Sequence, residues 1–392
     1  MRFELMAPCH FGLEACTKRE LTELGYEISE VQDGRVSFVG DELAVCRANI
    51  NLRTAERVLI KAAGFTARTW DELFEATKAI CWEEFLPYDA DFWVAKATTV
   101  KSKLFSPRDF QTIIQKAIAM RLSKAYGHEG ERLPMTGAAY PLRVSAYKDS
   151  IFIGLDTSGE SLHKRGYRRY TVKAPITETL AAALIMLTPW RRDRILVDPF
   201  CGSGTFLIEA AMMAADIAPG MERDFTATGW TDLVPRSYWM EAYDEARDRA
   251  EAVSGKGLSE VMDLQGFDID EEALYAARHN AELAGVSELI HFQKRDIREL
   301  SHPKRYGFII TNPPYGERIG ETEELPDIYR SLGERYRELK DWSMYLITAY
   351  EDAQKHLGRA ADRNRKIYNG MMKTYFYSYL GKRPEKRERS LQ

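Results

Sequence analysis

From about Leu162 onwards, short apolar segments alternate with helical stretches. Five of these segments, in chain order, are RILVDPF, VMDLQGFDID, LIHFQKRDI, YGFIITNPP and WSMYLITAY. Strands that are each preceded by a helix predict a parallel sheet with helices on both faces, because a parallel connection needs a crossover. The last segment, RKIYNGMMKTYFYSYL, instead reads as two strands around Asn369-Gly370. We therefore expect an α/β fold in which a doubly wound, seven-stranded sheet ends in an antiparallel hairpin.

The part of the chain before Leu162 has a different pattern, typical of α+β units. Residues 2–8 read as a strand, 12–25 as a helix, 26–40 as a hairpin turning at Asp33-Gly34, and 41–65 as a helix and a strand. Strand, helix, hairpin, helix and strand in this order are ferredoxin-like. A second α+β unit is expected from about Thr69. Its predicted helices and strands cover residues 70–80, 92–100, 107–127, 142–149 and 150–156.

Length and composition limit the possible classes of protein. The chain has 392 residues, more than one ordinary core accommodates, so two or three domains are expected. No apolar run approaches the ~20 residues that cross a bilayer, and the first residues lack the pattern of a signal peptide. The five cysteines are scattered and show no metal-ligand spacing. We therefore expect a cytoplasmic protein with no membrane segment, no metal and no structural disulfide.

Positive charge is concentrated at the junction between the two halves. The chain carries a net charge of −4, yet residues 161–197 contain eight Lys and Arg against two Asp and Glu. Tyrosines alternate with the cations there, in LHKRGYRRYTVK, and a second basic run lies in the C-terminal tail, GKRPEKRER. Clustered cations can follow a phosphate backbone. We expect Arg165, Arg168 and Arg169 to contact RNA.

A glycine-rich turn follows the first apolar strand. The residues Asp198-Pro-Phe-Cys-Gly202-Ser-Gly204-Thr205 lie between that strand and an apolar helix. Glycines at such a turn let a ligand approach the backbone, and the helix N-terminus favours a carboxylate or phosphate. The segment lacks the lysine of a P-loop and the third glycine of a dinucleotide fingerprint. Asp198 suits a cationic amino group beside a carboxylate, as in the amino-acid end of S-adenosylmethionine.

Two further carboxylates end the next two strands. Asp268 in GFDID is placed to accept hydrogen bonds from two ribose hydroxyls, and Asp296 in QKRDI from an adenine amine. Ligands of open α/β sheets bind at the carboxyl ends of the strands, so these acids are expected to share one site with the glycine turn. Asp270, in contrast, is predicted to be the N-cap of the following helix.

The fourth strand ends in Thr311-Asn312-Pro313-Pro314-Tyr315. Proline lacks the N–H that a sheet needs, so two prolines end the strand in a rigid corner. An exocyclic base amine is a poor nucleophile because its lone pair is delocalised. The Asn312 side-chain oxygen and the Pro313 carbonyl would accept its hydrogens and direct its lone pair at a methyl donor. Tyr315 would stack on the flipped base. A plain strand cap is the alternative.

These motifs resemble those of the THUMP-domain RNA guanine-N2 methyltransferases, nearest the bacterial 23S rRNA enzymes. The resemblance rests on DPFCGSGT, NPPYGERIG and LHKRGYR…KAPITETLAAAL, and extends over FTATGW…YWMEAYDEA to RKIYNG. It implies a ferredoxin-like domain (1–67), a THUMP RNA-binding domain (68–160) and a Rossmann-like class I methyltransferase domain (161–392). It also implies S-adenosylmethionine as cofactor, with Thr177 and Thr179 as further contacts. The remaining expected cofactor contacts, beside the acids and glycines above and Asn312, are Phe200, Thr205 and Ile269.

The expected reaction is transfer of a methyl group to the N2 amine of a guanosine in 23S rRNA or in a ribosome assembly intermediate. A tRNA guanosine is the close alternative. DNA adenine-N6 methylation uses the same corner, but the first half reads as an RNA-binding pair rather than a DNA-target domain. A catalytically silent assembly factor is the non-enzyme alternative. The sequence leaves the target nucleotide and the oligomeric state open.

Overall fold

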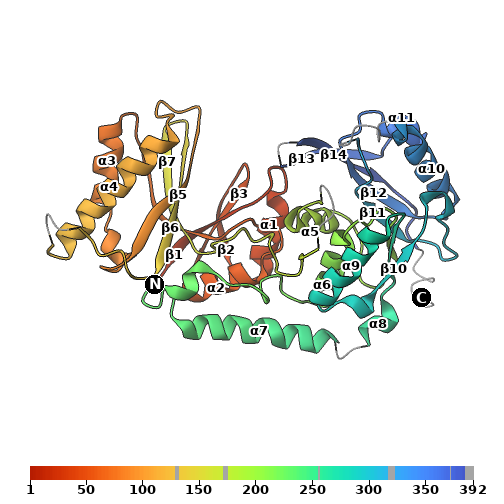
Figure 1. Ribbon diagram of the computed structural model, residues 1–392, viewed down its shortest axis with the longest axis horizontal. Helices are drawn as coiled ribbons and strands as arrows, with labels where there is room; N and C mark the ends of the chain where they lie inside the picture. Colours follow the sequence, from red (N-terminus) through yellow and green to blue (C-terminus); the bar gives the residue numbers. More distant parts are fainter. Residues whose placement is uncertain (129–131, 171–174, 255–256, 317–322, 371, 385–392) are drawn as a thin grey trace. The chain divides into compact units, whose positions relative to one another are not determined.

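The computed structural model describes residues 1–128, 132–170, 175–254, 257–316, 323–370 and 372–384, which fall into two compact units (Figure 1). The first unit takes most of residues 1–162 together with 223–244, and the second takes 10–16 and the remainder. Parts of both basic runs, residues 171–174 and the tail from 385, lie outside the described residues.

The first unit contains one continuous sheet in the order β2-β3-β1-β4-β7-β6-β5. The sheet combines the two predicted α+β units, and both predicted element orders are confirmed. Its elements are β1 (Phe3–Pro8), α1 (Glu14–Glu23), β2 (Glu27–Gln32), β3 (Arg35–Gly40), α2 (Glu42–Asn51), β4 (Leu59–Thr66), α3 (Trp70–Ala79), β5 (Asp91–Val100), α4 (Pro107–Ala125), β6 (Ala139–Tyr147) and β7 (Ser150–Asp156).

The strand β4 joins the two halves of this sheet. Leu59 and Ile60 pair with β1, whereas the whole strand, from Leu59 to Thr66, pairs antiparallel with β7. The edge of β4 that faces away from β1 would leave an open row of N–H and C=O groups, which β7 satisfies. The ferredoxin-like part and the following part therefore share one hydrogen-bonded sheet.

A segment from the second half of the chain also belongs to the first unit. Residues 226–229 form a short 3₁₀ helix, and the next residue, Trp230, is fully buried. Its ring stacks on Tyr140 of β6 at a centroid distance of 4.7 Å, and its indole N–H donates to the carbonyl of Ala139 (2.7 Å). The helix α7 (Arg236–Ser254) follows, and its residues are divided between the two units.

The second unit contains a seven-stranded sheet in the order β10-β9-β8-β11-β12-β14-β13, and the predicted strand number and terminal antiparallel hairpin are confirmed. The strands from β10 to β12 are parallel, and β14 runs antiparallel between β12 and β13. Its elements are α5 (Glu178–Met186), β8 (Leu196–Asp198), α6 (Thr205–Ala214), α8 (Leu258–Val261), β9 (Leu264–Asp268), α9 (Glu271–Leu283), β10 (Ile290–Lys294), β11 (Phe308–Thr311), α10 (Leu325–Glu338), β12 (Ser343–Thr348), α11 (Ala353–Leu357), β13 (Arg363–Asn369) and β14 (Met372–Tyr379).

Helices cover both faces of this sheet, so its central strands are buried throughout (Figure 1). Phe308 and Ile310 of β11 pack in the core cluster that contains α5 and α6, whereas Ile309 packs in the cluster that contains α10. Successive side chains of a strand point to opposite faces, so one apolar run serves both cores. This double burial fixes the strands, and with them the polar residues at their carboxyl ends.

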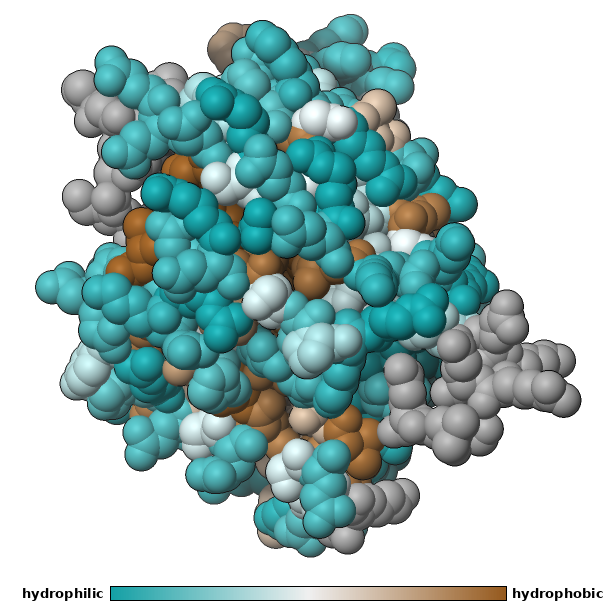
Figure 2. All heavy atoms as spheres, turned by 90° about the vertical axis from the view of Figure 1, so that its right-hand side faces the viewer, coloured by the Kyte–Doolittle hydropathy of each residue, from teal (hydrophilic) through white to brown (hydrophobic). Residues whose placement is uncertain are grey.

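No helix among the described residues is long and apolar enough to cross a membrane. On the face shown in Figure 2, hydrophilic side chains predominate, and the hydrophobic ones lie between them in small groups.

Candidate active site

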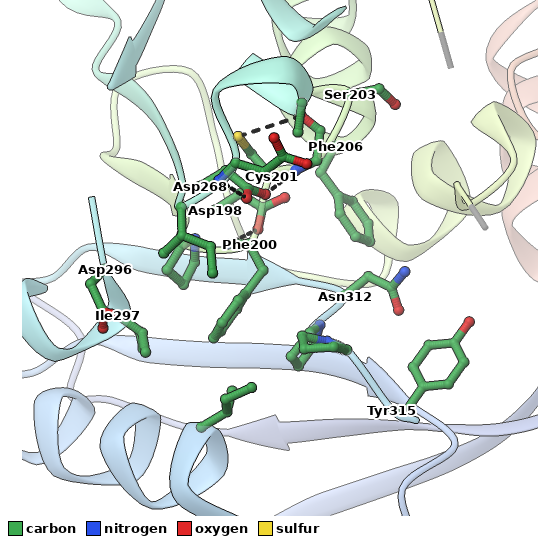
Figure 3. A pocket seen from close by; sticks show the side chains of 18 of the residues that line it. Asp198, Phe200, Cys201, Ser203, Phe206, Asp268, Asp296, Ile297, Asn312 and Tyr315 are labelled. Carbon is green, nitrogen blue, oxygen red and sulfur yellow. Dashed lines mark hydrogen bonds between the residues drawn. The ribbon is translucent and has the colours of Figure 1, made fainter. Parts of the chain in front are cut away.

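A pocket of about 660 Å³ lies in the second unit, at the carboxyl ends of β8, β9, β10 and β11. Residues far apart in the sequence meet there because neighbouring parallel strands end at the same edge of the sheet. In Figure 3, Asp198 and Asp268 lie side by side, and Asn312 and Tyr315 lie on the opposite side of the pocket from Asp296 and Ile297. The predicted site residues that line it are Asp198, Phe200, Gly202, Thr205, Asp268, Ile269, Asp296, Asn312, Pro313 and Tyr315.

Asp198 ends β8 and is almost fully buried, with 2% of its surface exposed. Its Oδ1 accepts a hydrogen bond from the Thr311 hydroxyl (2.6 Å) and another from the backbone N–H of Phe200 (3.2 Å). Burial raises the pKa of the Asp198 carboxyl to about 7, and the nearby Asp268 carboxylate acts in the same direction. A cationic ligand group beside Asp198 would therefore favour its charged form.

Two glycines shape the turn between β8 and α6. Gly202 (φ +51°) and Gly204 (φ +83°) both adopt the left-handed conformation that other residues rarely take. Gly204 is the residue before α6, and a Cβ there would come within 3.1–3.3 Å of Phe292, Ala277 and Ile208. Gly204 is not among the pocket lining, so the structure gives it a role in the turn and in helix packing, whereas Gly202 faces the pocket.

Asp268 ends β9 and holds the glycine turn in place. Its Oδ2 accepts from the N–H of Gly202 (2.9 Å), and its Oδ1 accepts from the N–H of Asp270 (3.0 Å). A carboxylate offers about four lone-pair positions, so each oxygen keeps capacity for a ligand hydroxyl. Burial raises the pKa of Asp268. Asp270 is the N-cap of α9, accepting from the N–H of Glu272 (2.9 Å), which confirms its prediction.

Asp296 follows β10 and begins a 3₁₀ turn, residues 297–299. Its Oδ1 accepts from the backbone N–H of Arg298 (2.8 Å), and the same atom lies 3.3 Å from the guanidinium Nε of Arg298. Asp296 is therefore held at the pocket rim by its own turn. Ile297 beside it adds an apolar surface on which a flat ring can lie.

The Asn312-Pro-Pro-Tyr corner directly follows β11, where it is held by residues that the sequence motifs do not include. The hydroxyl of Tyr329, a buried residue of α10, donates to the carbonyl of Pro314 (3.2 Å). The same hydroxyl lies 2.6 Å from the hydroxyl of Thr348, the last residue of β12. The sequence offers one signal for this role of Tyr329: its hydroxyl group stands within the apolar stripe of an amphipathic helix, where it needs a hydrogen-bond partner.

The pocket is strongly acidic. Among the described residues that line it, six are carboxylates and one, Arg298, is a cation. The carboxylates are Asp198, Asp268, Asp270, Asp296, Glu324 and Asp327. Such a lining disfavours a ligand rich in phosphates and favours one with a positive charge.

Besides Gly204, two further residues expected to contact the cofactor lie outside the pocket lining. Thr177 and Thr179 do not line the pocket. In this segment of the chain, the residues that line it are Pro175 and Ile176. Thr179 is fully buried, and its hydroxyl lies 3.3 Å from Nε2 of His10, while that of Thr177 lies 3.5 Å from the same atom. Their hydroxyls therefore tie the start of α5 to residue 10 within the second unit.

The three arginines expected to contact RNA have different positions. Arg165 is 2% exposed, and its guanidinium pairs with the buried Glu209 of α6 (Nε to Oε1, 3.3 Å), so phosphate contact by Arg165 does not fit the structure. Arg168 donates to the carbonyl of Ile176 (2.8 Å) and to the Thr205 hydroxyl (2.7 Å), which is a supporting role at the pocket edge. Arg169 alone of the three is exposed.

No group of three or more His, Cys, Asp or Glu side chains within the described ranges is arranged to hold a metal ion. The side chains that line the pocket offer acceptors for hydrogen bonds, aromatic and apolar surfaces, and negative charge.

Comparison with known families identifies the chain. A model described as "RMKL-like, methyltransferase domain" matches residues 165–377, more than half of the chain. The chain belongs to this methyltransferase family. Two further models, an RlmL ferredoxin-like domain and a THUMP domain, match residues 4–59 and 67–156. The resemblance stated from the sequence and the expected fold class are thereby confirmed.

Individual relatives agree with the family. The putative RNA methyltransferase YpsC of Bacillus subtilis is 42% identical over 99% of this chain and 98% of its own length. The ribosomal RNA large subunit methyltransferase K/L of Syntrophotalea carbinolica is 36% identical over 92% of this chain and 51% of its own length. This chain spans about half the length of the K/L enzymes. The solved structure of the putative methyltransferase SMU.472, complexed with SAH, is 38% identical, with a TM-score of 0.90 over 98% of this chain and 99% of the other.

Proposed function

We propose that this methyltransferase transfers a methyl group from S-adenosylmethionine to the N2 amine of a guanosine in RNA, with 23S rRNA as the substrate. The observation that carries the proposal is the meeting, in one acidic pocket, of the glycine turn, the strand-end carboxylates and the Asn312-Pro-Pro-Tyr corner. The division at residues 67 and 160, and a cytoplasmic location with the ribosomes, belong to the same proposal.

The pocket fits this cofactor in shape and charge. Gly202 and the start of α6 would bind the carboxylate, and the buried Asp198 would pair with the ammonium group. Asp268 would accept from the ribose hydroxyls and Asp296 from the adenine amine. Bound S-adenosylmethionine supplies an electrophilic methyl group on a sulfonium, and the negative lining stabilises that cation.

The corner after β11 supplies the orientation of the amine. The Asn312 oxygen and the Pro313 carbonyl would accept hydrogen bonds from the two N–H groups of N2 and direct its lone pair along the line of displacement. The N–C bond would form as the methyl–sulfur bond breaks, S-adenosylhomocysteine would leave, and one N2 proton would pass to solvent. The two prolines and the Tyr329 bond to Pro314 hold these acceptors rigidly, so little reorganisation is needed. Tyr315 lines the same pocket and offers its ring to the flipped guanine.

The RNA class rests on the printed names of the relatives and on the THUMP match. A tRNA guanosine would use the same chemistry. Arg169, the exposed member of the basic junction, remains the candidate there for a phosphate contact.

Nucleoside mass spectrometry of RNA from a strain lacking this gene tests the proposal. We expect N2-methylguanosine to be reduced in 23S rRNA and restored by the wild-type gene but not by an Asn312→Ala gene. Loss from tRNA with unchanged 23S rRNA would reassign the substrate. Unchanged N2-methylguanosine in both RNAs would contradict the proposal.

A further inference from the structure

Two loops meet at one end of the part of the sheet formed by β5, β6 and β7. The first loop, residues 101–106, links β5 to α4, and the second is the turn Lys148-Asp149 between β6 and β7. Lys148 N–H donates to the carbonyl of Val100 (3.1 Å), Lys103 N–H to Oδ1 of Asp149 (2.7 Å), and Asp149 N–H to the Ser102 hydroxyl (2.9 Å). The two loops and the paired strand ends before them, Val100 and Tyr147, therefore form one connected surface, which we call the THUMP tip.

The THUMP tip exposes apolar side chains that a folded core would normally bury. Phe105 is 76% exposed, Val100 52% and Tyr147 44%. Leu104, the residue before Phe105, is buried, and its carbonyl accepts a hydrogen bond from the Thr99 hydroxyl (2.7 Å). These contacts fix the loop that carries Phe105. An exposed phenylalanine on a fixed loop is better explained by a partner than by folding.

Positive charge surrounds these rings. Lys101, Lys103 and Lys148 are all exposed, and the ammonium of Lys148 lies 5.1 Å from the centre of the Tyr147 ring. The carboxylate of Asp149, the acidic residue of the turn, accepts from the first loop and lies 3.6 Å from Arg68. The outward charge of the tip is therefore positive, although the chain as a whole is acidic.

The backbone of the tip is built at some cost in stability. Lys148 (φ +49°) and Asp149 (φ +66°) both adopt the left-handed conformation in a two-residue hairpin, where Asn-Gly is the favoured pair. Lys101 (φ +52°) does the same in the neighbouring loop. Residues with strained backbone conformations concentrate at binding sites, where the function of the side chain outweighs the conformational cost of the turn.

We propose that the THUMP tip binds unpaired nucleotides of the RNA substrate, with bases stacked on Phe105 and Tyr147 and phosphates paired with Lys101, Lys103 and Lys148. Exposed rings stack on bases that are free of a helix, whereas duplex RNA is recognised by its shape and offers no base faces. This inference rests on the proposed RNA substrate and adds a second point of contact to the pocket. It directs the enzyme to an RNA that contains a loop, a bulge or a strand end in addition to the target guanosine.

Binding of the full chain to a 12-nucleotide single-stranded RNA and to a blunt duplex of the same sequence, measured by fluorescence anisotropy, tests the inference. The wild type should prefer the single strand. Phe105→Ala should weaken single-strand binding about 5- to 150-fold, the scale of one stacked base, and leave duplex binding unchanged. Phe105→Tyr should retain the preference. Replacing Lys101, Lys103 and Lys148 with Gln should lower the slope of log affinity against log salt by about 2.

Matched controls come from the same unit. Met240 is 66% exposed, so Met240→Ala removes an exposed apolar side chain outside the tip, and Lys18→Ala removes an exposed charge on α1. Neither should alter single-strand affinity by more than about twofold. All variants should keep the wild-type circular dichroism spectrum and melting temperature, which shows that the first unit is folded, and the wild-type affinity for S-adenosylmethionine, which shows that the pocket of the second unit is unchanged.

Equal wild-type affinity for the two RNAs, or unchanged binding by Phe105→Ala, would overturn the inference. The proposed function would still stand in that case if the wild type methylates extracted 23S rRNA. Phe105-dependent sedimentation with vesicles containing one-third anionic lipid, without an effect on RNA binding, would reassign the tip to a membrane surface. A wild type that neither binds nor methylates RNA would remove both proposals.

Discussion

The pocket of the second unit and the THUMP tip of the first are built on opposite physical principles. Six carboxylates line the pocket, and three of them, Asp198, Asp268 and Asp296, stand at the carboxyl ends of the parallel strands β8, β9 and β10. The tip consists of exposed rings and lysines on two loops that hydrogen-bond to each other. The pocket suits a small cation that must be held in one geometry, whereas the tip suits a large polyanion whose bases can vary.

This contrast has a consequence for the chain's charge. A net charge of −4 taken over the whole sequence argues against binding RNA, yet it averages an acidic pocket and a basic tip. If the two regions act independently, changes in the pocket should alter chemistry and cofactor binding, and changes in the tip should alter RNA capture. Each of the following predictions tests one side of that separation.

The largest effect is expected from Asn312→Ala. Single-turnover methylation at saturating cofactor should fall about 100- to 1000-fold, the scale for losing one preorganised acceptor at a reacting group. Affinities for S-adenosylmethionine and for single-stranded RNA should stay within about twofold of wild type. Combining Asn312→Ala with Phe105→Ala should multiply the two separate losses, because the two sites share no residues. A wild-type rate for Asn312→Ala would reduce the corner to a strand cap.

Asp268→Ala should weaken binding of S-adenosylmethionine by roughly 1–3 kcal/mol, because hydrogen bonds to a charged acceptor are lost. Titration calorimetry measures this loss directly. The matched variant Asp270→Ser removes a neighbouring carboxylate of the same pocket but keeps the N-cap of α9, and should have a much smaller effect. Equal losses in the two variants would mean that general negative charge, rather than the ribose contact, holds the cofactor.

The raised pKa of Asp198, about 7, predicts a pH dependence of the pocket alone. Cofactor affinity should fall by up to about tenfold per pH unit below 7, as Asp198 becomes protonated. The stability of the protein without cofactor should change in the opposite direction and increase as the pH falls below about 7. Because the folded state binds this proton between about pH 4 and 7 and the unfolded state does not, the Asp198 contribution to the free energy of unfolding decreases as pH rises through that range.

Asp198→Asn should reduce both trends and leave the part that Asp268, whose pKa is also raised by burial, contributes. RNA binding to the THUMP tip should depend on pH in the same way with and without the substitution. Calorimetry would measure the cofactor affinity, and thermal melts would measure the stability, at about pH 5.5, 6.5 and 7.5. A cofactor affinity that stays flat over this range in the wild type would contradict the assignment of Asp198 to the ammonium group.

The smallest effect is expected from Tyr329→Phe. Its hydroxyl positions the Pro314 carbonyl, so losing it should lower turnover about 2- to 10-fold with an unchanged KM for RNA. Tyr336→Phe is the matched control, since Tyr336 lies on the same helix and its hydroxyl donates to the carbonyl of Trp342 (2.9 Å) instead. Both variants should lose similar stability in thermal melts. Equal turnover in the two would show that Tyr329 only supports the fold.

The structural features that depend on a local sequence pattern could be predicted from the sequence. The alternation of strands and helices, the hairpin around residues 369–370 and the cap at Asp270 all follow from neighbours within a few positions, and all are confirmed. The pocket lining was largely predictable because the fold rule places strand ends at one edge.

The sequence could not predict what depends on distant partners. Arg165 looked like a phosphate contact because its local segment is basic, but Glu209, 44 residues away, pairs with it inside the unit. Tyr329 supports the corner through a bond that crosses from a helix to a loop. Phe105 would by type be assigned to the core, and its exposure appears only once the loops are placed.

Methyl transfer in vitro tests the central claim most directly. The purified protein would be incubated with S-adenosylmethionine labelled in its methyl group and with 23S rRNA from the strain lacking the gene, and the labelled nucleoside identified by mass spectrometry. The account predicts label in N2-methylguanosine, at a rate reduced by Asn312→Ala and, through weaker RNA capture, by Phe105→Ala. Label in N6-methyladenosine instead, or no transfer to RNA by the wild type, would contradict it.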